Sequence, residues 1–304
     1  MGDEASDRTR VIDWLLDGDA VIRWQTLRDL VGVEDSEWRP EQESVATEGW
    51  GARLLEHQDE DGRWTPRLYG RKWISTTYTM VLLREMGLPR SDTRALKSCH
   101  LFLKERLGTR RNGDTCVSAM VLALLFWFDV EDEKRVPVLG YLLDKQLPDG
   151  GWNCETDSQH GSFHTTLSAL EALRVCAVAG AAGLDEIEAA EARGREFFLQ
   201  HRMFRSHRSG EIVNERFLRF SFPPRWHYDV LRGLDYFWSA GSLHDPRLHE
   251  AIDVVVEKRD RDGRWPLQQR WPGETWFEME TVGEPSRWNT LRAMRVLDGW
   301  PDEM

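Results

Sequence analysis

The chain alternates between strongly apolar stretches and more polar, amphipathic stretches of similar length. Apolar residues recur at helical spacing, and no segment keeps the alternation of period two that is typical of strands. The apolar stretches predict helices over residues 21–32, 74–86, 114–128, 162–176, 225–239 and 286–298. The polar stretches predict helices over residues 41–57, 91–106, 132–146, 185–201 and 245–259. We therefore expect an all-α protein with almost no sheet.

A turn pattern recurs between these helices, which indicates an internal repeat. The pattern Gln/Arg-x-x-Asp-Gly-x-Trp occurs at residues 58–64, 146–152 and 259–265, and Asp-Gly favours the positive φ of a turn. The first and last apolar stretches nearly match, as RWQTLRDL and RWNTLRAM. This match favours six helix pairs closed into a ring, with apolar helices inside and polar helices outside. An open solenoid of helix pairs is the alternative.

Composition narrows the class of protein. The 304 residues favour a single repeat-built domain over residues 1–304, with residues 1–10 as a flexible tail. The net charge of -12 argues against nucleic acid or an anionic membrane as the main partner. No apolar run is long enough to predict a membrane span, and four cysteines do not indicate a disulfide scaffold. We expect a cytoplasmic protein, in which the 15 tryptophans are the unusual feature.

The Asp-Gly-x-Trp repeats resemble the QW motif of the terpenoid cyclases, which include the squalene–hopene cyclases. The helix order over about residues 10–300 resembles the (α/α)6 toroid that those cyclases share with the β subunits of protein prenyltransferases. The resemblance implies that the inner helices present their N-terminal ends at one mouth of a central cavity. Two features depart from the cyclases: the chain lacks the Asp-x-Asp-Asp acid motif, and it has one toroid instead of two helical domains.

A zinc site is implied by the resemblance to the prenyltransferases, which bind zinc through Asp-x-Cys at one inner-helix start and His at a later one. Asp114, Cys116 and His164 match these positions, and three protein ligands leave one position open for a reacting group. Arg111 matches a basic residue near the substrate's diphosphate. Without a metal, Asp114 would be a helix cap and Cys116 a small core residue. His164 would cap its helix or bond a neighbouring carbonyl. Alternative ligands lie in the loop before His164: Cys154 and His160.

Other polar residues near the expected mouth are candidates for proton transfer. His227, Tyr228 and Asp229 are predicted to share one turn of the fifth apolar helix, where they could act as general acid or base. Glu280, in the loop before the last apolar helix, is a further candidate. For Asp229 and Glu280 the alternative is an ion pair with a neighbouring arginine. The basic segment 201–208 either receives an anion or is the solvated end of an outer helix.

Aromatic residues near the expected helix starts are candidates for lining an apolar cavity or stabilising a cation through a ring face. They are Trp73, Phe163, Trp226 and Trp288. For the tryptophans of the repeated turn we instead expect a structural role, in which each joins neighbouring repeats. These are Trp64, Trp152 and Trp265.

Three hypotheses for function follow. The first is a zinc-dependent enzyme, similar to a prenyltransferase β subunit, that acts on an apolar, isoprenoid-like substrate in the central cavity. The second is a metal-free, terpenoid cyclase-like enzyme, for which no acid is identified. The third is a toroidal binding protein that has the fold without chemistry.

Overall fold

The computed structural model describes residues 2–70, 72–108, 114–130, 133, 135–155 and 157–300. Over these residues the fold is helical, and the only extended pairings are isolated bridges such as Ser221 with Gln269. The prediction of an all-α protein is confirmed. None of the helices in this described part is long and apolar enough to cross a membrane.

Six helices come from the apolar stretches of the sequence, and we call them the central helices. They are α2 (Ala20–Thr26, continued by the π-helical turn η1, Leu27–Val31), α5 (Thr76–Met86), α7 (Thr115–Trp127), α9 (Phe163–Val178), α11 (Val230–Ser239) and α13 (Arg287–Gly299). Most of them begin within two residues of the predicted start. Helix α11 is the exception, because it was predicted from residue 225 and begins at Val230.

The polar stretches form the peripheral helices. They are α1 (Gly2–Leu16), α3 (Asp35–Ser44), α4 (Gly49–Leu55), α6 (Thr93–Lys104), α8 (Arg135–Asp144), α10 (Leu184–Gln200) and α12 (His249–Glu257), with short 3-10 turns η2 (Glu215–Leu218) and η3 (Pro246–Leu248). The single helix predicted over residues 41–57 is two helices, α3 and α4. Residues 2–10, which we expected to form a tail, belong to α1, whose Val11 and Leu15 are buried.

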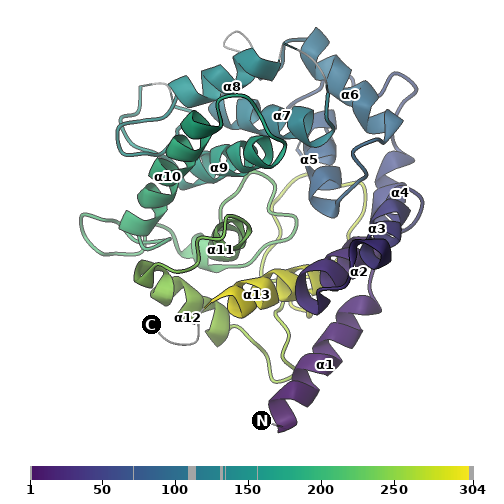
Figure 1. The fold of residues 1–304 in the computed structure, drawn as a ribbon, viewed down its shortest axis with the longest axis vertical. Coiled ribbons are helices and arrows are strands. Elements are labelled where there is room, and N and C mark those ends of the chain that lie inside the picture. The colour runs from purple at the N-terminus through teal and green to yellow at the C-terminus, as the bar shows by residue number, and fades with distance from the viewer. Residues whose placement is uncertain are drawn as a thin grey trace.

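The central helices are neighbours in chain order, and the last one returns to the first. Helix α5 packs against α7, α7 against α9, α9 against α11, α11 against α13, and α13 against α2. Helix α2 also reaches the end of α5, because the Trp24 indole N–H donates to the carbonyl of Met86 at 2.8 Å. In Figure 1 the peripheral helices α6, α8, α10 and α12 lie outside the central ones.

The repeated turn has the same hydrogen bonds in all three copies. Each tryptophan is buried, and its indole N–H donates to the carbonyl ten residues earlier, at the end of a peripheral helix: Trp64 to Leu54 (2.7 Å), Trp152 to Leu142 (2.8 Å) and Trp265 to Val255 (2.7 Å). Each tryptophan backbone N–H donates to a threonine hydroxyl in the next central helix: Thr76 (3.1 Å), Thr166 (2.9 Å) and Thr290 (3.0 Å). The predicted role of these tryptophans in joining repeats is confirmed.

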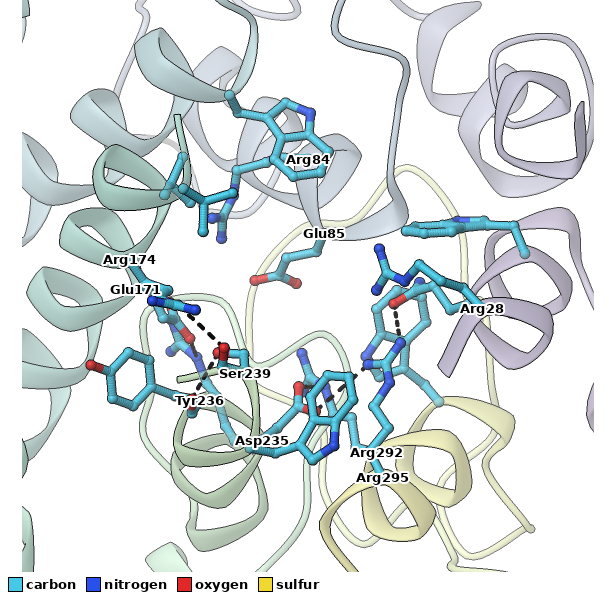
Figure 2. Close-up of a pocket in the computed structure, with 18 of the residues that line it drawn as sticks. Arg28, Arg84, Glu85, Glu171, Arg174, Asp235, Tyr236, Ser239, Arg292 and Arg295 are labelled. Carbon is cyan, nitrogen blue, oxygen red and sulfur yellow. Dashed lines mark hydrogen bonds and ion pairs between the residues drawn. The ribbon is translucent and has the colours of Figure 1, made fainter. Parts of the chain in front are cut away.

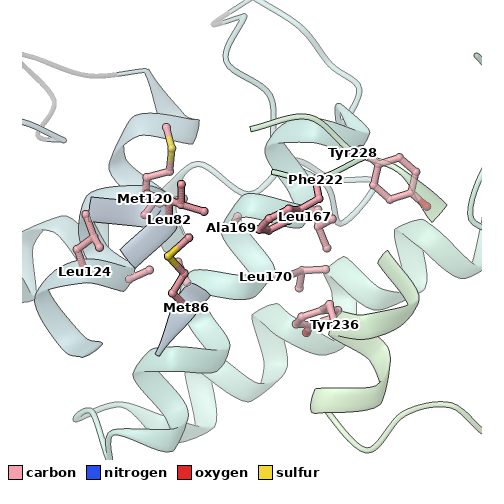
Figure 3. Close-up of a cluster of buried hydrophobic side chains, with 14 of the residues drawn as sticks. Leu82, Met86, Met120, Leu124, Leu167, Ala169, Leu170, Phe222, Tyr228 and Tyr236 are labelled. Atoms are coloured by element: carbon pink, nitrogen blue, oxygen red, sulfur yellow. The ribbon is translucent and has the colours of Figure 1, made fainter. Parts of the chain in front are cut away.

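Much of the apolar core lies between the central helices. Figure 3 shows Met86 of α5, Met120 of α7 and Leu170 of α9 in one cluster, which extends to Phe222 and Tyr228 in the loop before α11. All five side chains are buried. Side-chain packing therefore fills the space between these helices at the level of this cluster.

Candidate functional site

The N-terminal ends of the central helices are packed under two loops, residues 219–229 and 266–286. The loops pair with each other where the backbone N–H of Gln268 donates to the carbonyl of Phe220 at 3.1 Å. The second loop also contacts α5, because the Trp276 indole N–H donates to the Thr79 hydroxyl at 3.2 Å. The spaces left between these loops and the helices are about 20 Å³ and 10 Å³. Such volumes are far below those of small-molecule sites.

His227 lies in an aromatic stack at this end. Its ring stacks on Trp226 and Trp271, with centroids 3.7 and 3.4 Å apart, and burial lowers its pKa to about 3. The Trp73 indole, almost fully buried, donates to the carbonyl of Trp271 at 3.1 Å and so fixes the stack. His227 is therefore neutral near pH 7, with Trp226 stacked on its ring and Trp73 packed edge-on against it.

Tyr228 and Asp229 do not share a helical turn with His227, because α11 begins only at Val230. Asp229 is the N-cap of α11: its carboxylate accepts hydrogen bonds from the backbone N–H of Arg232 at 2.9 Å and from the Ser221 hydroxyl at 2.7 Å. Burial raises the pKa of Asp229. The Tyr228 hydroxyl donates to the carbonyl of Met203 at 2.6 Å, and burial raises its pKa well above the ordinary value.

Glu280 caps another central helix. Its carboxylate accepts hydrogen bonds from the Ser286 hydroxyl and from the backbone N–H of Trp288, at the start of α13. Burial raises its pKa. Within the described residues neither Asp229 nor Glu280 forms the ion pair with arginine that was the alternative, whereas Glu278, two residues before Glu280, pairs with Arg270.

Cys116 contacts Cys154 near the start of α7. The backbone N–H of Cys116 donates to the Cys154 sulfur at 3.3 Å, and that sulfur lies 3.4 Å from the Thr165 hydroxyl. The hydrogen bond from the Cys116 thiol lowers the pKa of Cys154 to about 7 and raises that of Cys116. Asp114 is exposed at the N-cap of α7. Among the residues considered as zinc ligands, Cys154, one of the two alternatives, is thus the one that contacts Cys116.

His164 faces another partner. Its Nδ1 accepts the backbone N–H of Tyr228 at 2.8 Å, and burial lowers its pKa to about 4. A neutral imidazole with Nδ1 as acceptor carries its proton on Nε2, so it has no free lone pair for a metal. Within the described residues, no group of three His, Cys, Asp or Glu side chains is placed to hold a metal ion. The expected triad therefore does not fit zinc in this arrangement. Zinc binding stays a prediction, and Arg111 lies outside the described residues.

A groove of about 430 Å³ lies beside the start of α9. It is lined in part by Phe163, His160 and the basic segment 201–208. Its polar groups pair with each other: His207 Nδ1 lies 2.9 Å from His201 Nε2, and Arg208 donates to His160 Nε2 at 3.3 Å. The ring of Phe163 packs within the surrounding phenylalanine cluster.

A cavity of about 270 Å³ lies at the C-terminal ends of α5, α7 and α9 and beside α2, α11 and α13, and we call it the arginine cavity. All six central helices or the residues that directly follow them contribute to its wall (Figure 2). The lining residues are Trp24, Gln25, Arg28, Arg84, Glu85, Arg90, Trp127, Glu171, Arg174, Val175, Val178, Arg232, Asp235, Tyr236, Trp238, Ser239, Trp288, Arg292 and Arg295. Seven of these are arginines and three are acids, so the lining carries a formal excess of positive charge.

Three of the arginines are almost completely buried and pair with acids of the wall. Arg232 donates to both carboxylate oxygens of Glu171, at 2.9 and 2.6 Å. Arg292 and Arg295 contact Asp235 at 3.3 and 3.6 Å. Their exposed fractions are 3 %, 6 % and 5 % for Arg232, Arg292 and Arg295. These pairs form a rigid charged frame.

Three further arginines of the wall make no ion pair with an acid of the described residues. Across the described residues, no carboxylate pairs with Arg84, Arg90 or Arg174. Arg90 lies over the ring of Trp127, 5.1 Å from its centroid, and Arg174 donates to the carbonyl of Ser239 at 3.2 Å. These three guanidinium groups are available to an anion.

Buried polar atoms without hydrogen-bond partners gather at the same cavity. Across the described residues, the unpartnered atoms include Arg84 Nε, Arg295 Nε, Trp288 Nε1 and Asp235 Oδ1, and all four side chains line the cavity. Buried polar groups in proteins are nearly always satisfied, so a bound molecule or water is expected to complete them. Among the aromatic residues predicted to bind substrate, Trp288 lines this cavity.

Glu85 has no partner in the cavity. Its carboxylate makes no hydrogen bond or ion pair within the described part of the chain. Figure 2 shows it reaching into the open space between Arg84, Arg28 and Asp235. Burial raises its pKa, although nearby arginines oppose the shift.

The sequence contains a signal for this cavity. Arg84, Glu85, Glu171 and Arg232 interrupt stretches that are otherwise apolar enough to be core. Charged residues in such helices are rarely buried unless they are paired or functional. The resemblance implies a cavity at the N-terminal ends of the helices, whereas Arg84 and Glu85 lie at the C-terminal end of α5 and Glu171 lies in the middle of α9.

Comparisons with known proteins add no assignment. No protein-family model matches the chain, and a search of curated proteins finds no matching relative.

Proposed function

We propose that the central and peripheral helices form one closed (α/α)6 toroid, similar to those of terpenoid cyclases and prenyltransferase β subunits. We further propose that the arginine cavity is its binding site for a small organic anion. Closure is supported by the packing of α13 against α2 and by the contribution of all six central helices to one cavity.

The observation that carries this proposal is that side chains with unpartnered buried donors gather at one positively charged cavity. Arg84 Nε, Arg295 Nε and Trp288 Nε1 have no hydrogen-bond partner in the described part of the chain, and all three residues line the cavity. A guanidinium binds carboxylate or phosphate oxygens through two parallel N–H groups. An oxyanion would satisfy these donors and offset the excess positive charge.

The ligand is proposed to have an organic part as well as an anionic group. Four tryptophans line the cavity: Trp24, Trp127, Trp238 and Trp288. Their rings provide apolar surface beside the arginines. An isoprenoid phosphate therefore fits the cavity chemically, which keeps the isoprenoid hypothesis but moves its site to the arginine cavity.

The enzyme and binding-protein hypotheses differ in the role of Glu85. A carboxyl group with a raised pKa can donate or accept a proton near neutral pH, and Glu85 would supply the acid that the sequence motifs lack. In a binding protein the same group would only contact the ligand. The proposal favours an enzyme that needs no metal in this cavity, and zinc at Cys116 stays a separate prediction.

Isothermal titration calorimetry with phenyl phosphate and inorganic pyrophosphate tests the binding site. We expect the wild-type chain to bind phenyl phosphate, and Arg84→Met to bind it about tenfold or more weakly, because a desolvated charged hydrogen bond is lost. Arg202→Met is the matched control, since Arg202 pairs with Glu250 on the surface. Absence of binding by both anions, or equal affinity in Arg84→Met and wild type, would contradict the proposal.

A further inference from the structure

We propose that the arginine cavity binds its oxyanion together with one shared proton, and that Glu85 shares this proton with the ligand. The class of ligand is then a phosphate monoester, which can bring the proton itself, in preference to a sulfate ester. This inference rests on the proposed function, because it names the anion that the cavity takes.

Glu85 is the one cavity acid left without a cation. Glu171 is held by two hydrogen bonds from Arg232, and Asp235 contacts Arg292 and Arg295. Within the described residues Glu85 has no hydrogen bond or ion pair, although it is half-buried and points into the cavity. The cavity thus combines arginine N–H donors that have no carboxylate partner with one unpaired carboxylate, that of Glu85.

The charges that face Glu85 come from every central helix except α7. The cations are Arg28 of η1, Arg84 of α5, Arg174 of α9, Arg232 of α11, and Arg292 and Arg295 of α13, with Arg90 following α5 and Arg225 in the loop before α11. The other titratable groups are Glu171 of α9 and Asp235 and Tyr236 of α11. Both of these acids are paired, and no histidine lines the cavity. Glu85 is therefore the group expected to change its protonation when an anion enters.

A proton between Glu85 and the ligand would stabilise the complex. An ionised carboxylate and a fully ionised oxyanion repel each other at hydrogen-bond distance, whereas one proton between them forms a short charge-assisted hydrogen bond. A phosphate monoester has a second pKa near 6 and can hold that proton. A sulfate ester has no proton at neutral pH, so Glu85 must take one from solvent before the ester binds.

Phenyl sulfate is the most informative probe, because it does not titrate near neutral pH. Calorimetry in buffers of different ionisation enthalpy measures the protons taken up on binding. We expect wild-type protein to take up protons when phenyl sulfate binds at pH 7.5. Its affinity is expected to fall with rising pH, approaching about tenfold per unit when one proton is coupled.

Glu85→Gln mimics the protonated acid, so we expect phenyl sulfate to bind this variant without proton uptake and with affinity that is flat from pH 6 to 8. Glu250→Gln is the matched control, because Glu250 lies outside the cavity and pairs with Arg202 and Arg205. A thermal melt checks that both variants fold. Phenyl phosphate is expected to bind wild type about tenfold or more tightly than phenyl sulfate at pH 7.5.

The outcomes separate this inference from the proposed function. If neither ester binds wild type, the binding site itself is wrong. If both bind but phenyl sulfate takes up no proton, or if Glu85→Gln keeps the wild-type pH dependence, the role of Glu85 is overturned while the site stands. Inorganic phosphate binding more tightly than phenyl phosphate would overturn the assignment to an ester.

Discussion

The Trp152→Phe substitution tests how the repeated turn holds neighbouring helices together. The indole of Trp152 is 0 % exposed, and its N–H donates to the carbonyl of Leu142 at 2.8 Å. Phenylalanine keeps an aromatic ring in this place but removes the donor and part of the ring volume. The loss therefore has two parts, a hydrogen bond and a cavity.

Both parts can be estimated from the contacts. The carbonyl of Leu142 also accepts the backbone N–H of Lys145 at 3.2 Å, so it keeps a partner and the lost bond is expected to cost about 1 kcal/mol. The unfilled volume adds about 1–2 kcal/mol, because a rigid core collapses only partly around it. The free energy of unfolding of Trp152→Phe is therefore expected to fall by about 2–3 kcal/mol.

Urea unfolding followed by circular dichroism measures this change. The same substitution at Trp64 or Trp265 is expected to have a similar effect, within about 1 kcal/mol, because the three copies have the same hydrogen bonds. Trp300→Phe is the control, since Trp300 is only partly buried and should change stability by less than about 0.5 kcal/mol. If Trp152→Phe is no less stable than Trp300→Phe, the structural account of the turn is refuted.

Three further predictions concern charged groups and metal. Glu171→Gln should destabilise the fold by about 3–5 kcal/mol, because the buried charge of Arg232 loses its carboxylate partner. In a double-mutant cycle with Arg232→Met, losses of stability that simply add would contradict this coupling. Since the pKa of His164 lies near 4 in the fold, unfolded histidine binds the proton first, and stability is expected to decline as pH falls from about 7 to 4. His164→Gln should make that part of the profile less steep, with the buried His227 accounting for the slope that remains, and an unchanged profile would argue against this. Elemental analysis of the purified protein tests for zinc. Loss of the metal in both Cys116→Ala and His164→Ala would support the predicted site, whereas loss in Cys154→Ala but not in His164→Ala would make Cys154 a ligand in place of His164. A folded wild-type protein without metal would contradict zinc binding.

The helices could be predicted from the sequence because each central helix is a long apolar run with local boundary signals. The start of α11 could not, since the aromatic and polar residues 225–229 continue the apolar pattern although they are not helical. Asp229 is an N-cap only because Ser221 and the loop around it meet its carboxylate. The break between α3 and α4 falls before Gly49, which has a φ of +65°. The two glycines of this stretch, Gly49 and Gly51, do not outweigh its helical pattern.

The site could be predicted less well, because it depends on contacts between distant parts of the chain. The backbone N–H of Trp73 donates to the carbonyl of Glu274 at 2.6 Å, and this pairing helps to close the end of the fold where we expected a cavity. No local pattern contains that contact. The arginine cavity likewise needs six helices to meet before its charges form one group. What the sequence did contain was the charge itself, at positions such as Arg84 and Glu85 within apolar runs.

The location of a bound organic phosphate tests the central claim most directly. A crystal structure of the wild-type protein with phenyl phosphate shows which end of the central helices binds the anion. We predict phosphate density in the arginine cavity, in contact with Arg84 and Glu85 and with the phenyl ring against the tryptophans of the wall. Phosphate density at the N-terminal ends of the helices, beside Cys116 and Cys154, with an empty arginine cavity, would contradict the account.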